Sequence, residues 1–392
     1  MHIGVDACCW ANRRGYGRFT RELLTALIAT DRKNNYCFFV DQANSAISEF
    51  PDGVNKIIVN TSISPLEAAS ASGNRSVRDV WAMTRQVLKH DLNLFFFPTV
   101  YSYFPILNQS KIALTIHDMI PDSHPAEVFP NRKRKFFWRL KQFMALRQAD
   151  LILTVSEYSK REILHYCRLR DAQVRVVPEA PGVAFKQLPH DEQMMQALKR
   201  YQFPPTQRFL LHVGGISPHK NLKTLIHVFS RLIGEASFSD LKLVLVGDYT
   251  TDSFYSDYPA LRLQIDQLSL AEKVIFTGFV SDDELAILYN AALLVVFPSF
   301  AEGFGLPAIE AMACGTPVAA SNAGSLPETL AEAGRFFDPH NSAQMLDTVR
   351  RILTDDTLRQ EMKQRGLNRS KQFQWSKASE TLLSIFEEMK KQ

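Results

Sequence analysis

Short apolar runs alternate with helical stretches along the whole chain, and this alternation constrains the fold more than any other feature. Many of the runs are continuously apolar, which is typical of parallel strands covered by helices on both faces. Strands that alternate with helices predict a parallel α/β architecture. The expected strands form two successive sets: residues 3–6, 36–40, 56–59, 92–97, 112–116, 151–155 and 174–177, then residues 209–213, 241–246, 274–276, 293–297, 317–320 and 335–337.

The length of the chain and the distribution of proline divide these strands into two domains. A chain of 392 residues exceeds the roughly 250–300 residues at which a single hydrophobic core stops growing. Between Pro178 and Pro205 repeated prolines resist regular structure around one polar helix at residues 191–201. We therefore expect two doubly wound α/β domains. Their predicted bounds are residues 1–185 and 206–372, with a linker region at 186–205 and a final helix at 373–392.

Composition excludes several classes of protein. Hydrophobic residues make up 46% of the chain and charged residues 22%, which is typical of a globular protein. No apolar run approaches the roughly 20 residues of a membrane span. Residues 1–6 predict a strand and not a signal peptide. The five cysteines are odd in number and form no C-x-x-C pair, so we expect reduced thiols in a cytoplasmic protein and no zinc site.

Residues 302–310 form a candidate phosphate-binding element after an apolar strand. Glu302 and Glu310 enclose seven residues, among them Gly303, Gly305 and Pro307. Glycine lets the backbone approach a ligand closely, and proline suits the first turn of a helix. The N-terminus of that helix would face a phosphate, and Glu310 could accept hydrogen bonds from vicinal hydroxyls such as those of a ribose. A glycine-rich turn with two solvated acids is the alternative.

A second candidate element opens the second domain at residues 212–222. Gly214 and Gly215 follow a buried strand, and Lys220 comes a few residues later. Glycines followed by a lysine at the end of a strand suit a diphosphate, since the backbone can come close and the ammonium supplies charge. A solvated loop lysine would be the alternative for Lys220 alone. Its combination with the element at 302–310 favours phosphate binding.

In the first domain, His117 and Asp118 end the strand expected at residues 112–116. Ligands of open α/β sheets gather at the carboxyl ends of strands, so His117 is a candidate binding residue. A single histidine at a strand end can also be structural. We expect Asp118 to orient loops through backbone hydrogen bonds and not to perform chemistry.

The loop after the first strand imitates a dinucleotide-binding fingerprint. Gly15 and Gly17 open a helix, and Asp41 follows the next strand. The fingerprint requires its first glycine in the tight turn, whereas here Gly15 comes eight positions after Ala7. Thr20 also replaces the third glycine. A nicotinamide-dependent enzyme is therefore disfavoured.

Residues 131–147 combine basic and aromatic side chains. They hold seven Lys and Arg and no acid, with Phe136, Phe137, Trp138 and Phe143 among them. Residues 1–185 as a whole hold 24 Lys and Arg against 17 Asp and Glu, a net +7, whereas the rest hold 21 against 24, a net −3. Such a helix could lie on an anionic membrane or recruit a lipid-linked acceptor. An amphipathic helix whose aromatics pack on the sheet is the alternative.

Together these motifs resemble the retaining glycosyltransferases of family 4, whose GT-B fold consists of two Rossmann-like doubly wound domains facing across a cleft. The stretch from Glu302 to Glu310 matches the E-x7-E signature of that family, and residues 214–221 resemble its G-T-I-E-P-R-K-N stretch. Lys220 matches the family's lysine, but His219 stands where the family has arginine. Histidine is charged only below about pH 6.5 unless perturbed, so this departure concerns the strength of diphosphate binding and not its location.

The resemblance implies a role for each matched residue of the second domain. Lys220, helped by His219, would neutralise the leaving nucleoside diphosphate, while Glu302 would bind a sugar hydroxyl and Glu310 the ribose. Glu328, in a stretch that resembles the family's G-G-x-P-E, would hold the loop around the donor pocket or complement a helix dipole. The expected donor-binding residues are Gly17, Gly214, Gly215, His219, Lys220, Gly303, Phe304, Gly305, Leu306 and Glu310.

The first domain would contribute fewer groups. The resemblance implies that His117 positions the hexose, so that His117, Lys220 and Glu302 form the catalytic set. Gly17, within a stretch that resembles the family's G-x-G-R-[YF] element, would lie near the reacting groups. Arg18 would contact acceptor or donor, or pair on the surface. The final helix of GT-B enzymes often crosses back to the first domain, and residues 373–392 are the candidate for it.

The resemblance also implies substrates. The P-x-K-N variant resembles mannosyltransferases of bacterial surface polysaccharides, which favours GDP-mannose as the donor, with UDP-linked hexoses next. The acceptor would be a glycan on a polyprenyl or other lipid carrier, reached in the cytoplasm or at the inner face of the membrane. The chain contains no D-x-D pair, so we expect no metal and no cofactor besides the donor. Nothing in the chain indicates a nucleic-acid partner.

Two other classes of protein stay open. A GT-B nucleotide-sugar isomerising enzyme would share the nucleotide site but need no acceptor, and the E-x7-E element and the basic first half disfavour it. A non-catalytic GT-B subunit would bind a nucleotide or a partner and regulate an active transferase. Only His219 in place of arginine favours that subunit.

Overall fold

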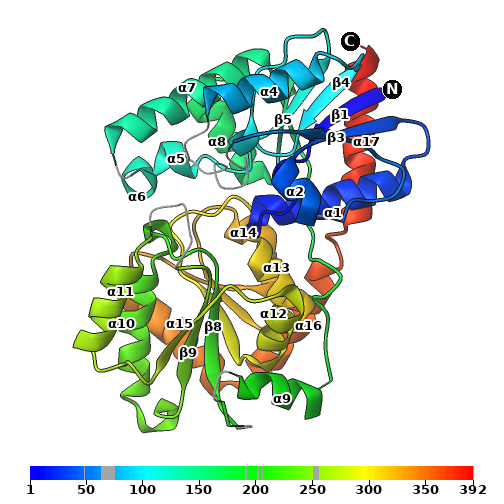
Figure 1. The fold of residues 1–392 in the computed structure, drawn as a ribbon. Helices are drawn as coiled ribbons and strands as arrows, with labels where there is room; N and C mark the ends of the chain where they lie inside the picture. Colours follow the sequence, from blue (N-terminus) through cyan, green and yellow to red (C-terminus); the bar gives the residue numbers. More distant parts are fainter. Residues whose placement is uncertain are drawn as a thin grey trace. The chain divides into compact units, whose positions relative to one another are not determined.

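The chain divides into two compact units, each of which is described here by itself (Figure 1). Unit 1 comprises Met1–Glu179 and Gln374–Gln392, and unit 2 comprises Ala180–Phe373. The computed structural model describes residues 1–47, 49–62, 76–129, 131–189, 192–200, 203–204, 206–249 and 256–391. The division falls at Glu179 and not at residue 185. The expected linker at 186–205 lies within unit 2, where helix α9 (Glu192–Lys199) buries Met194 and Leu198.

Unit 1 contains a parallel sheet of seven strands in the order β3-β2-β1-β4-β5-β6-β7. Ile3 of β1 pairs with Tyr36 of β2 on one side and with Leu94 of β4 on the other. The strand order therefore reverses direction beside β1, which is where open α/β sheets form ligand crevices. The strands are β1 (His2–Asp6), β2 (Asn35–Asp41), β3 (Asn55–Val59), β4 (Leu94–Phe97), β5 (Lys111–Thr115), β6 (Leu151–Thr154) and β7 (Val174–Val176).

The last helix of the chain, α17 (Trp375–Lys391), belongs to unit 1 and packs against α1 (Gly15–Thr30). Its apolar side chains recur every three or four residues, which places them on one helical face. Trp375 contacts Phe19 edge to face at 6.0 Å between ring centroids, and Phe386 contacts Phe96 at 5.5 Å. The other helices of the unit are α2 (Gln42–Ile47), α4 (Val77–Val87), α5 (Ile120–Ser123), α6 (Pro125–Val128), α7 (Arg132–Gln148) and α8 (Glu157–Cys167), with the 3-10 turns η1 (Val100–Ser102) and η2 (Asp171–Gln173).

Unit 2 contains a second parallel sheet, of six strands in the order β10-β9-β8-β11-β12-β13. β8 is the first strand of unit 2 along the chain, and it lies between β9 and β11. The strand order of this sheet therefore also reverses beside its first strand. This places the loops after β8 and β11 next to each other at the carboxyl edge. The strands are β8 (Phe209–Val213), β9 (Lys242–Val246), β10 (Val274–Gly278), β11 (Leu294–Phe297), β12 (Val318–Ser321) and β13 (Arg335–Phe337).

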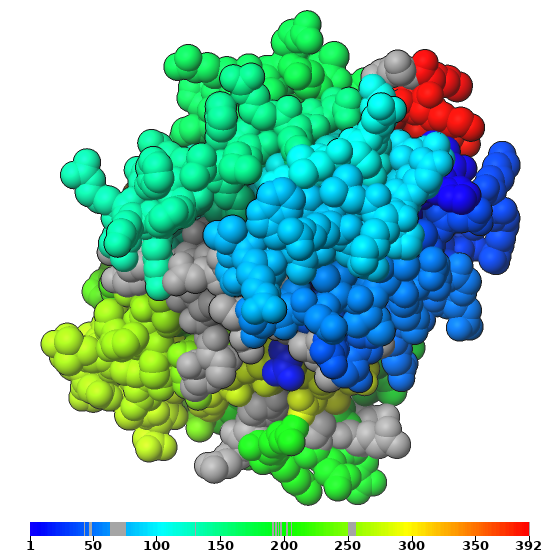
Figure 2. All heavy atoms as spheres, turned by 45° about the horizontal axis from the view of Figure 1, so that its top comes forward, coloured from blue at the N-terminus to red at the C-terminus, as the bar shows by residue number. Residues whose placement is uncertain are grey.

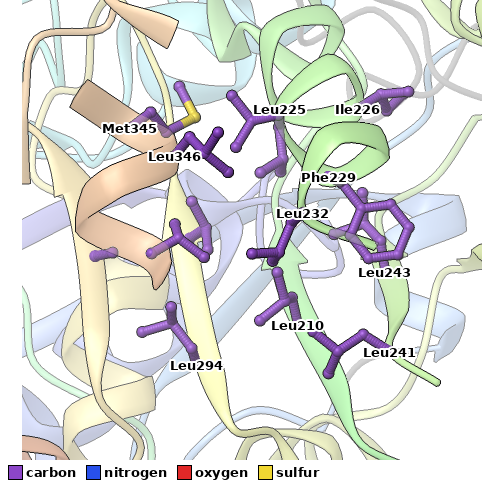
Figure 3. Packing of buried hydrophobic residues seen from close by; sticks show 14 of the residues in the cluster. Leu210, Leu225, Ile226, Phe229, Leu232, Leu241, Leu243, Leu294, Met345 and Leu346 are labelled. Atoms are coloured by element: carbon purple, nitrogen blue, oxygen red, sulfur yellow. The ribbon is translucent and has the colours of Figure 1, made fainter. Parts of the chain in front are cut away.

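The core of unit 2 lies between its sheet and two helices, α10 (Leu222–Ile233) and α15 (Ser342–Thr354) (Figure 3). Leu225, Phe229 and Leu232 of α10 follow helical spacing and are fully buried. Burying each such side chain contributes roughly 1.5–3 kcal/mol. The other helices are α11 (Tyr258–Gln267), α12 (Asp282–Ala291), α13 (Leu306–Ala313), α14 (Leu326–Leu330) and α16 (Asp356–Ser370), with η3 (Pro218–Lys220), η4 (Ala236–Phe238) and η5 (Ala331–Ala333).

Every strand expected from the sequence is present, with ends that differ by no more than a few residues. The prediction of two doubly wound parallel α/β domains is confirmed. Among the described residues, no helix is both long and apolar enough to cross a membrane.

Candidate functional site

The loop after β8 contains the first part of the site. Gly214 donates its amide to Val246 O at 2.9 Å, and Gly215 leads into the short turn η3, where Lys220 is the last residue. Asn221 then adopts a left-handed conformation (φ 56°) as the N-cap of α10. Its side-chain amide donates to Pro298 O at 3.0 Å and Pro339 O at 2.9 Å. The strained residue after Lys220 is thereby held in place, which fixes the start of the lysine side chain.

The loop after β11 contains the second part. It ends at Gly305, the N-cap of α13, whose φ of 86° is a left-handed conformation that favours glycine. Pro307 occupies the first turn of α13, as expected from the sequence. Phe304 and Leu306 are buried, and Phe304 O accepts a hydrogen bond from Thr329 Oγ1 at 2.6 Å. These contacts fix the loop that precedes α13, and with it the N-terminus of the helix.

Backbone hydrogen bonds join these loops to each other and to the loop after β12. His219 is half-buried, and its carbonyl accepts the amide of Phe300 at 2.8 Å. Gly324, after β12, lies so close that an added Cβ would stand 2.6 Å from the backbone nitrogen of Glu302. The amide of Ser325 donates to Glu302 O at 3.1 Å. Three loops at one sheet edge thus converge on Glu302.

Lys220 and Glu302 form an ion pair at this convergence. Lys220 Nζ donates to Glu302 Oε1 at 2.7 Å and to Oε2 at 2.8 Å, and Ser299 Oγ donates to Oε1 at 2.7 Å. Burial alone would raise the pKa of Glu302, but the ammonium and the two donors outweigh burial and lower it. Glu302 is therefore ionised at neutral pH. The pair sets a cation and an anion beside the N-terminus of α13.

Glu310 lies inside α13 and is fully buried. Tyr289 Oη, also buried, donates to Glu310 Oε2 at 3.4 Å. Burial, and then the charge of Glu310, raise the pKa of the nearby Cys314 thiol to about 12. In this structure the carboxylate of Glu310 is thus covered by protein, and Glu302 is the more accessible member of the two-carboxylate motif.

Glu328 is exposed on α14, and its backbone oxygen accepts a hydrogen bond from Arg369 Nη2 at 2.8 Å. The neighbouring Ser325 and Thr329 bond to the site loops, Ser325 through its amide to Glu302 O and Thr329 through its hydroxyl to Phe304 O.

His212, the fourth residue of β8, is a site residue that sequence reasoning left without a role. Its Nδ1 lies 2.9 Å from Val296 O, which only accepts, so Nδ1 carries the proton and Nε2 presents a lone pair. Within the described residues Nε2 has no hydrogen-bond partner. A Cβ built on Gly214 would stand 3.4 Å from Nε2 and 3.9 Å from Lys220 Nζ, so both nitrogens border the same space. Burial is the main cause that lowers the His212 pKa to about 4, with Lys220 adding to it.

The signal for His212 was present in the sequence, since a polar residue stands in the otherwise apolar run of β8. The serine at position 299 carried no comparable signal, because serine after a strand is common in loops. Only the three-dimensional contact with Glu302 reveals its role.

In unit 1, His117 follows β5 and is buried, as is Glu179. His117 Nε2 lies 3.0 Å from Pro98 O, so it donates there, and Nδ1 lies 3.5 Å from Glu179 Oε1. The rings of Phe19 and His117 form a T-shaped pair at 4.7 Å between centroids. Both ring nitrogens therefore have protein partners. Glu179 is a partner that the sequence did not indicate. Asp118 Oδ1 accepts the amide of Ile120 at 3.0 Å, which fixes the following turn.

Gly17 lies in the first turn of α1, packed against the preceding loop. An added Cβ would stand 2.1 Å from the backbone oxygen of Asn12, so only glycine fits there. Arg18 is half-buried in the same turn. The close packing therefore explains why position 17 is a glycine without any contact to a ligand.

The structure thus gathers the predicted residues of unit 2 at the edge formed by β8, β11 and β12, and places His117, Asp118, Gly17 and Arg18 in unit 1. Among the residues described, no three His, Cys, Asp or Glu side chains come together in a way that could hold a metal ion.

Comparison with known proteins gives the family. The model of "Glycosyltransferase Family 4" matches residues 13–180, and that of "Glycosyl transferases group 1" matches residues 195–369. The O-antigen chain mannosyltransferase B of Escherichia coli is 30% identical over 282 residues, which cover 70% of each chain. The serotype-specific mannosyltransferase WbdA of Escherichia coli is 31% identical over 279 residues, 70% of this chain.

The chain spans about a third of the length of WbdA, since the match covers 33% of that protein. Among solved structures, sucrose-phosphate synthase from Thermosynechococcus elongatus superposes with a TM-score of 0.77 at 20% identity, covering 99% of both chains. That likeness shows the fold. With its two doubly wound parallel sheets, its E-x7-E element and a relative of 30% identity, the chain belongs to the glycosyltransferases of family 4, which have the GT-B fold.

Proposed function

We propose that the chain transfers a hexose from a nucleoside diphosphate sugar to a glycan or lipid-linked acceptor in the synthesis of a surface polysaccharide, with retention of configuration. The observation that carries the proposal is the pair of Lys220 and Glu302 beside the N-terminus of α13. An ammonium and a helix N-terminus are the groups that a departing diphosphate requires. The cation is held at the carboxyl end of a strand, as ligand-binding groups of α/β sheets are.

Binding would redistribute the bonds of this pair. Lys220 would exchange one of its two contacts with Glu302 for a phosphate oxygen, next to Gly214 and Gly215. The carboxylate, still held by Ser299, would then be able to accept a hydrogen bond from a sugar hydroxyl. Gly303, Phe304, Gly305 and Leu306 would add backbone donors, and His219 a further contact.

Glu310 would bind the ribose only if its carboxylate became accessible, because Tyr289 and the surrounding residues cover it. We infer that a ribose hydroxyl replaces the Tyr289 hydroxyl as the hydrogen-bond donor to Glu310, since the contact between Tyr289 Oη and Glu310 Oε2 is long, at 3.4 Å. For unit 1 we propose that the His117 side chain positions the hexose. Pro98 O and Glu179 would hold the imidazole ring in a fixed orientation.

Mannose is the proposed sugar and GDP-mannose the proposed donor, because the relatives of 30% and 31% identity are named mannosyltransferases. UDP-linked hexoses come next. The proposed chemistry uses neither metal nor cofactor, since Lys220 and the α13 N-terminus supply the positive charge. A location in the cytoplasm, at the inner face of the membrane, is part of the proposal.

Calorimetric titration with GDP, UDP and ADP in EDTA tests the donor site. We expect one nucleotide to bind without metal and Lys220→Ala to weaken it by about 100-fold, which corresponds to about 3 kcal/mol for a charge-assisted contact. The conservative Lys220→Arg should retain part of the affinity. Equal affinity of Lys220→Ala and the natural protein would contradict the assignment.

The non-catalytic subunit is the second candidate, favoured by His219 and by the burial of Glu310. Transfer from radiolabelled GDP-mannose to a lipid-linked glycan separates it from the transferase. Glu310→Gln should abolish transfer in an enzyme. A protein that binds the nucleotide but turns over no GDP- or UDP-linked sugar with lipid-linked or water-soluble glycans would instead support the subunit.

A further inference from the structure

Helix α7 exposes three of its four aromatic side chains. Phe136, Phe137 and Phe143 are 63%, 59% and 56% exposed, and only Trp138 packs inward. Figure 2 shows side chains of the blue-green segment around α7 standing out from the surface. The expectation that the aromatics as a group pack on the sheet is wrong, because the helix is rotated so that its three phenylalanines face solvent. An exposed apolar face does not show what covers it, whereas a buried polar atom without a partner indicates one kind of chemical group.

His212 contains such a buried atom. Its side chain is fully buried in β8, and Nδ1 donates a hydrogen bond to Val296 O at 2.9 Å. Nε2 therefore has a lone pair and no proton, and no group among the described residues bonds to it. An apolar side chain in this otherwise apolar strand would leave no acceptor unpaired. The unpaired nitrogen is therefore a reason to look for a donor in the space that it faces.

The ammonium of Lys220 borders that space. The point that a Cβ of Gly214 would occupy lies 3.4 Å from His212 Nε2, 3.7 Å from Lys220 Cε and 3.9 Å from Lys220 Nζ. Because glycine has no Cβ, the place beside both nitrogens is left free. The charge of Lys220 also helps to lower the pKa of His212, which agrees with the two groups lying close together.

The number of protons on Lys220 exceeds the number of its acceptors. An ammonium has three protons to donate, and in this structure Nζ bonds to Oε1 and Oε2 of Glu302. No further acceptor of Nζ is present in the part of the chain that the structure describes. Lys220 thus has a proton without an acceptor, and His212 has a lone pair without a donor, at the same space.

We propose that His212 is a positioning residue for Lys220, whose third ammonium proton Nε2 accepts when the diphosphate of the donor binds. The inference rests on the proposed function, in which Lys220 exchanges one contact with Glu302 for a phosphate oxygen. The carboxylate, the phosphate and His212 would then accept one proton each. A lysine side chain is long and flexible, so three acceptors fix the direction of its ammonium where one or two do not. A hydrogen bond from a charged donor is also stronger than one between neutral groups.

A direct contact between the phosphate and His212 is the competing arrangement. A phosphate oxygen and the bare Nε2 are both acceptors, so they would repel each other unless Nε2 took up a proton. Burial opposes that proton, and the charge of Lys220 opposes it further. The side chain of Lys220 is also 16% exposed, whereas His212 is fully buried. The lysine is therefore the group that a phosphate reaches.

Calorimetric titration of the whole protein with GDP, UDP and ADP in EDTA near neutral pH tests the inference. His212→Phe keeps a planar ring but removes the acceptor, and it should weaken binding of the preferred nucleotide on the order of 10-fold. His212→Gln keeps an acceptor in its side-chain oxygen and should retain most of the affinity. The matched control Thr84→Val removes another buried donor to a backbone oxygen, Pro105 O at 2.8 Å in unit 1, and should bind as the natural protein does.

A double variant separates the positioning role from a general disturbance of the loop after β8. In the Lys220→Ala background, His212→Phe should cause no further loss of nucleotide affinity, because Nε2 acts through the lysine. Losses that add up in the double variant would show that His212 supports the loop independently of Lys220, and they would overturn the inference.

Nitrogen NMR of the natural protein labelled with 15N in histidine identifies the group that meets Nε2. The resonance of His212 is the one that is missing in His212→Gln. Nucleotide should shift the Nε2 resonance part of the way toward that of a protonated nitrogen, and Lys220→Ala saturated with the same nucleotide should show no such shift. Full protonation of Nε2 would indicate direct phosphate contact and would overturn the inference, as would an unchanged resonance. This measurement does not depend on the folding of His212→Phe.

The outcomes separate the inference from the proposed function. If the natural protein and His212→Phe bind the nucleotide equally well, the inference is overturned and the proposed function is left standing. If the natural protein binds none of the three nucleotides, the proposed function is contradicted, and the inference with it.

Discussion

In unit 2 the candidate site residues Lys220 and Glu302 form an ion pair, whereas in unit 1 the His117 side chain is anchored to the backbone. Lys220 Nζ has both oxygens of Glu302 as partners, and the two side chains keep exposed fractions of 16% and 11%. His117 donates to a peptide oxygen and packs against Phe19, with Glu179 behind it. Under the proposed function, Lys220 would exchange one of its contacts with Glu302 for a phosphate oxygen. The anchored histidine can only present its ring in a fixed orientation.

The largest expected effect tests whether the ion pair is needed for the fold of unit 2. Lys220→Met should lower the free energy of unfolding at pH 7 by about 3 kcal/mol, because it leaves a largely buried carboxylate without its cation. Urea unfolding would measure it. The double variant Lys220→Met and Glu302→Gln should recover most of the loss. If the two substitutions destabilise additively, the pair is not coupled and the contrast with unit 1 fails.

The second prediction concerns how the free energy of unfolding depends on pH through His212 in unit 2. Its pKa is about 4 in the folded protein, below the ordinary histidine pKa of 6.5 that applies to the unfolded chain, so the unfolded state binds a proton first as pH falls. The free energy of unfolding should therefore decrease from pH 6.5 to pH 4, by up to about 3 kcal/mol.

His212→Phe should flatten that slope, since phenylalanine does not titrate and fits beside Phe297. Glu302 loses its contribution only as pH falls below its unfolded pKa near 4.5, because its folded pKa is lowered. A slope between pH 6.5 and 4.5 that persists in His212→Phe would assign it to other groups.

Two glycines with the same backbone angle compare the units directly. Gly305 and Gly53 both have φ of 86°, so alanine is strained at each by roughly 1–2 kcal/mol. A Cβ on Gly305 would also stand 2.9 Å from Leu326 Cδ2, whereas a Cβ on Gly53 meets nothing within 4 Å. Thermal unfolding should show Gly305→Ala to be the more destabilising change. Equal losses would mean that the loop before α13 is less tightly packed than the contacts indicate.

The smallest expected effect concerns the unit 1 anchor. Glu179→Gln should destabilise the protein by about 1 kcal/mol, because the contact with His117 is long and Pro98 O still holds the ring. The control Glu157→Gln changes an exposed glutamate in the same unit. Differential scanning calorimetry would compare them. A loss as large as that of Lys220→Met would show that His117 depends on charge, as the unit 2 pair does.

The expected strands were found because thirteen short apolar runs, each bounded by polar or turn residues, carry their own signal. The division at Glu179 was missed by a few residues. Proline-rich punctuation marks where structure is interrupted, but the contacts of α9 decide to which unit that segment belongs. The rotation of α7 was also hidden, since its aromatic residues occur on both of its faces and only packing shows which face is covered.

The two α/β units, the loops at the strand ends and the candidate phosphate-binding residues could be predicted from the sequence alone. Strand and helix signals are local, and glycine, proline and lysine reveal their use within a few residues. Only the tertiary structure shows that Glu302 accepts hydrogen bonds from both Lys220 and Ser299, that His212 faces the same space and that Glu179 lies beside His117. Lys220 and Glu302 are 82 positions apart, and 62 positions separate His117 from Glu179, so only the folded chain brings the members of each pair together.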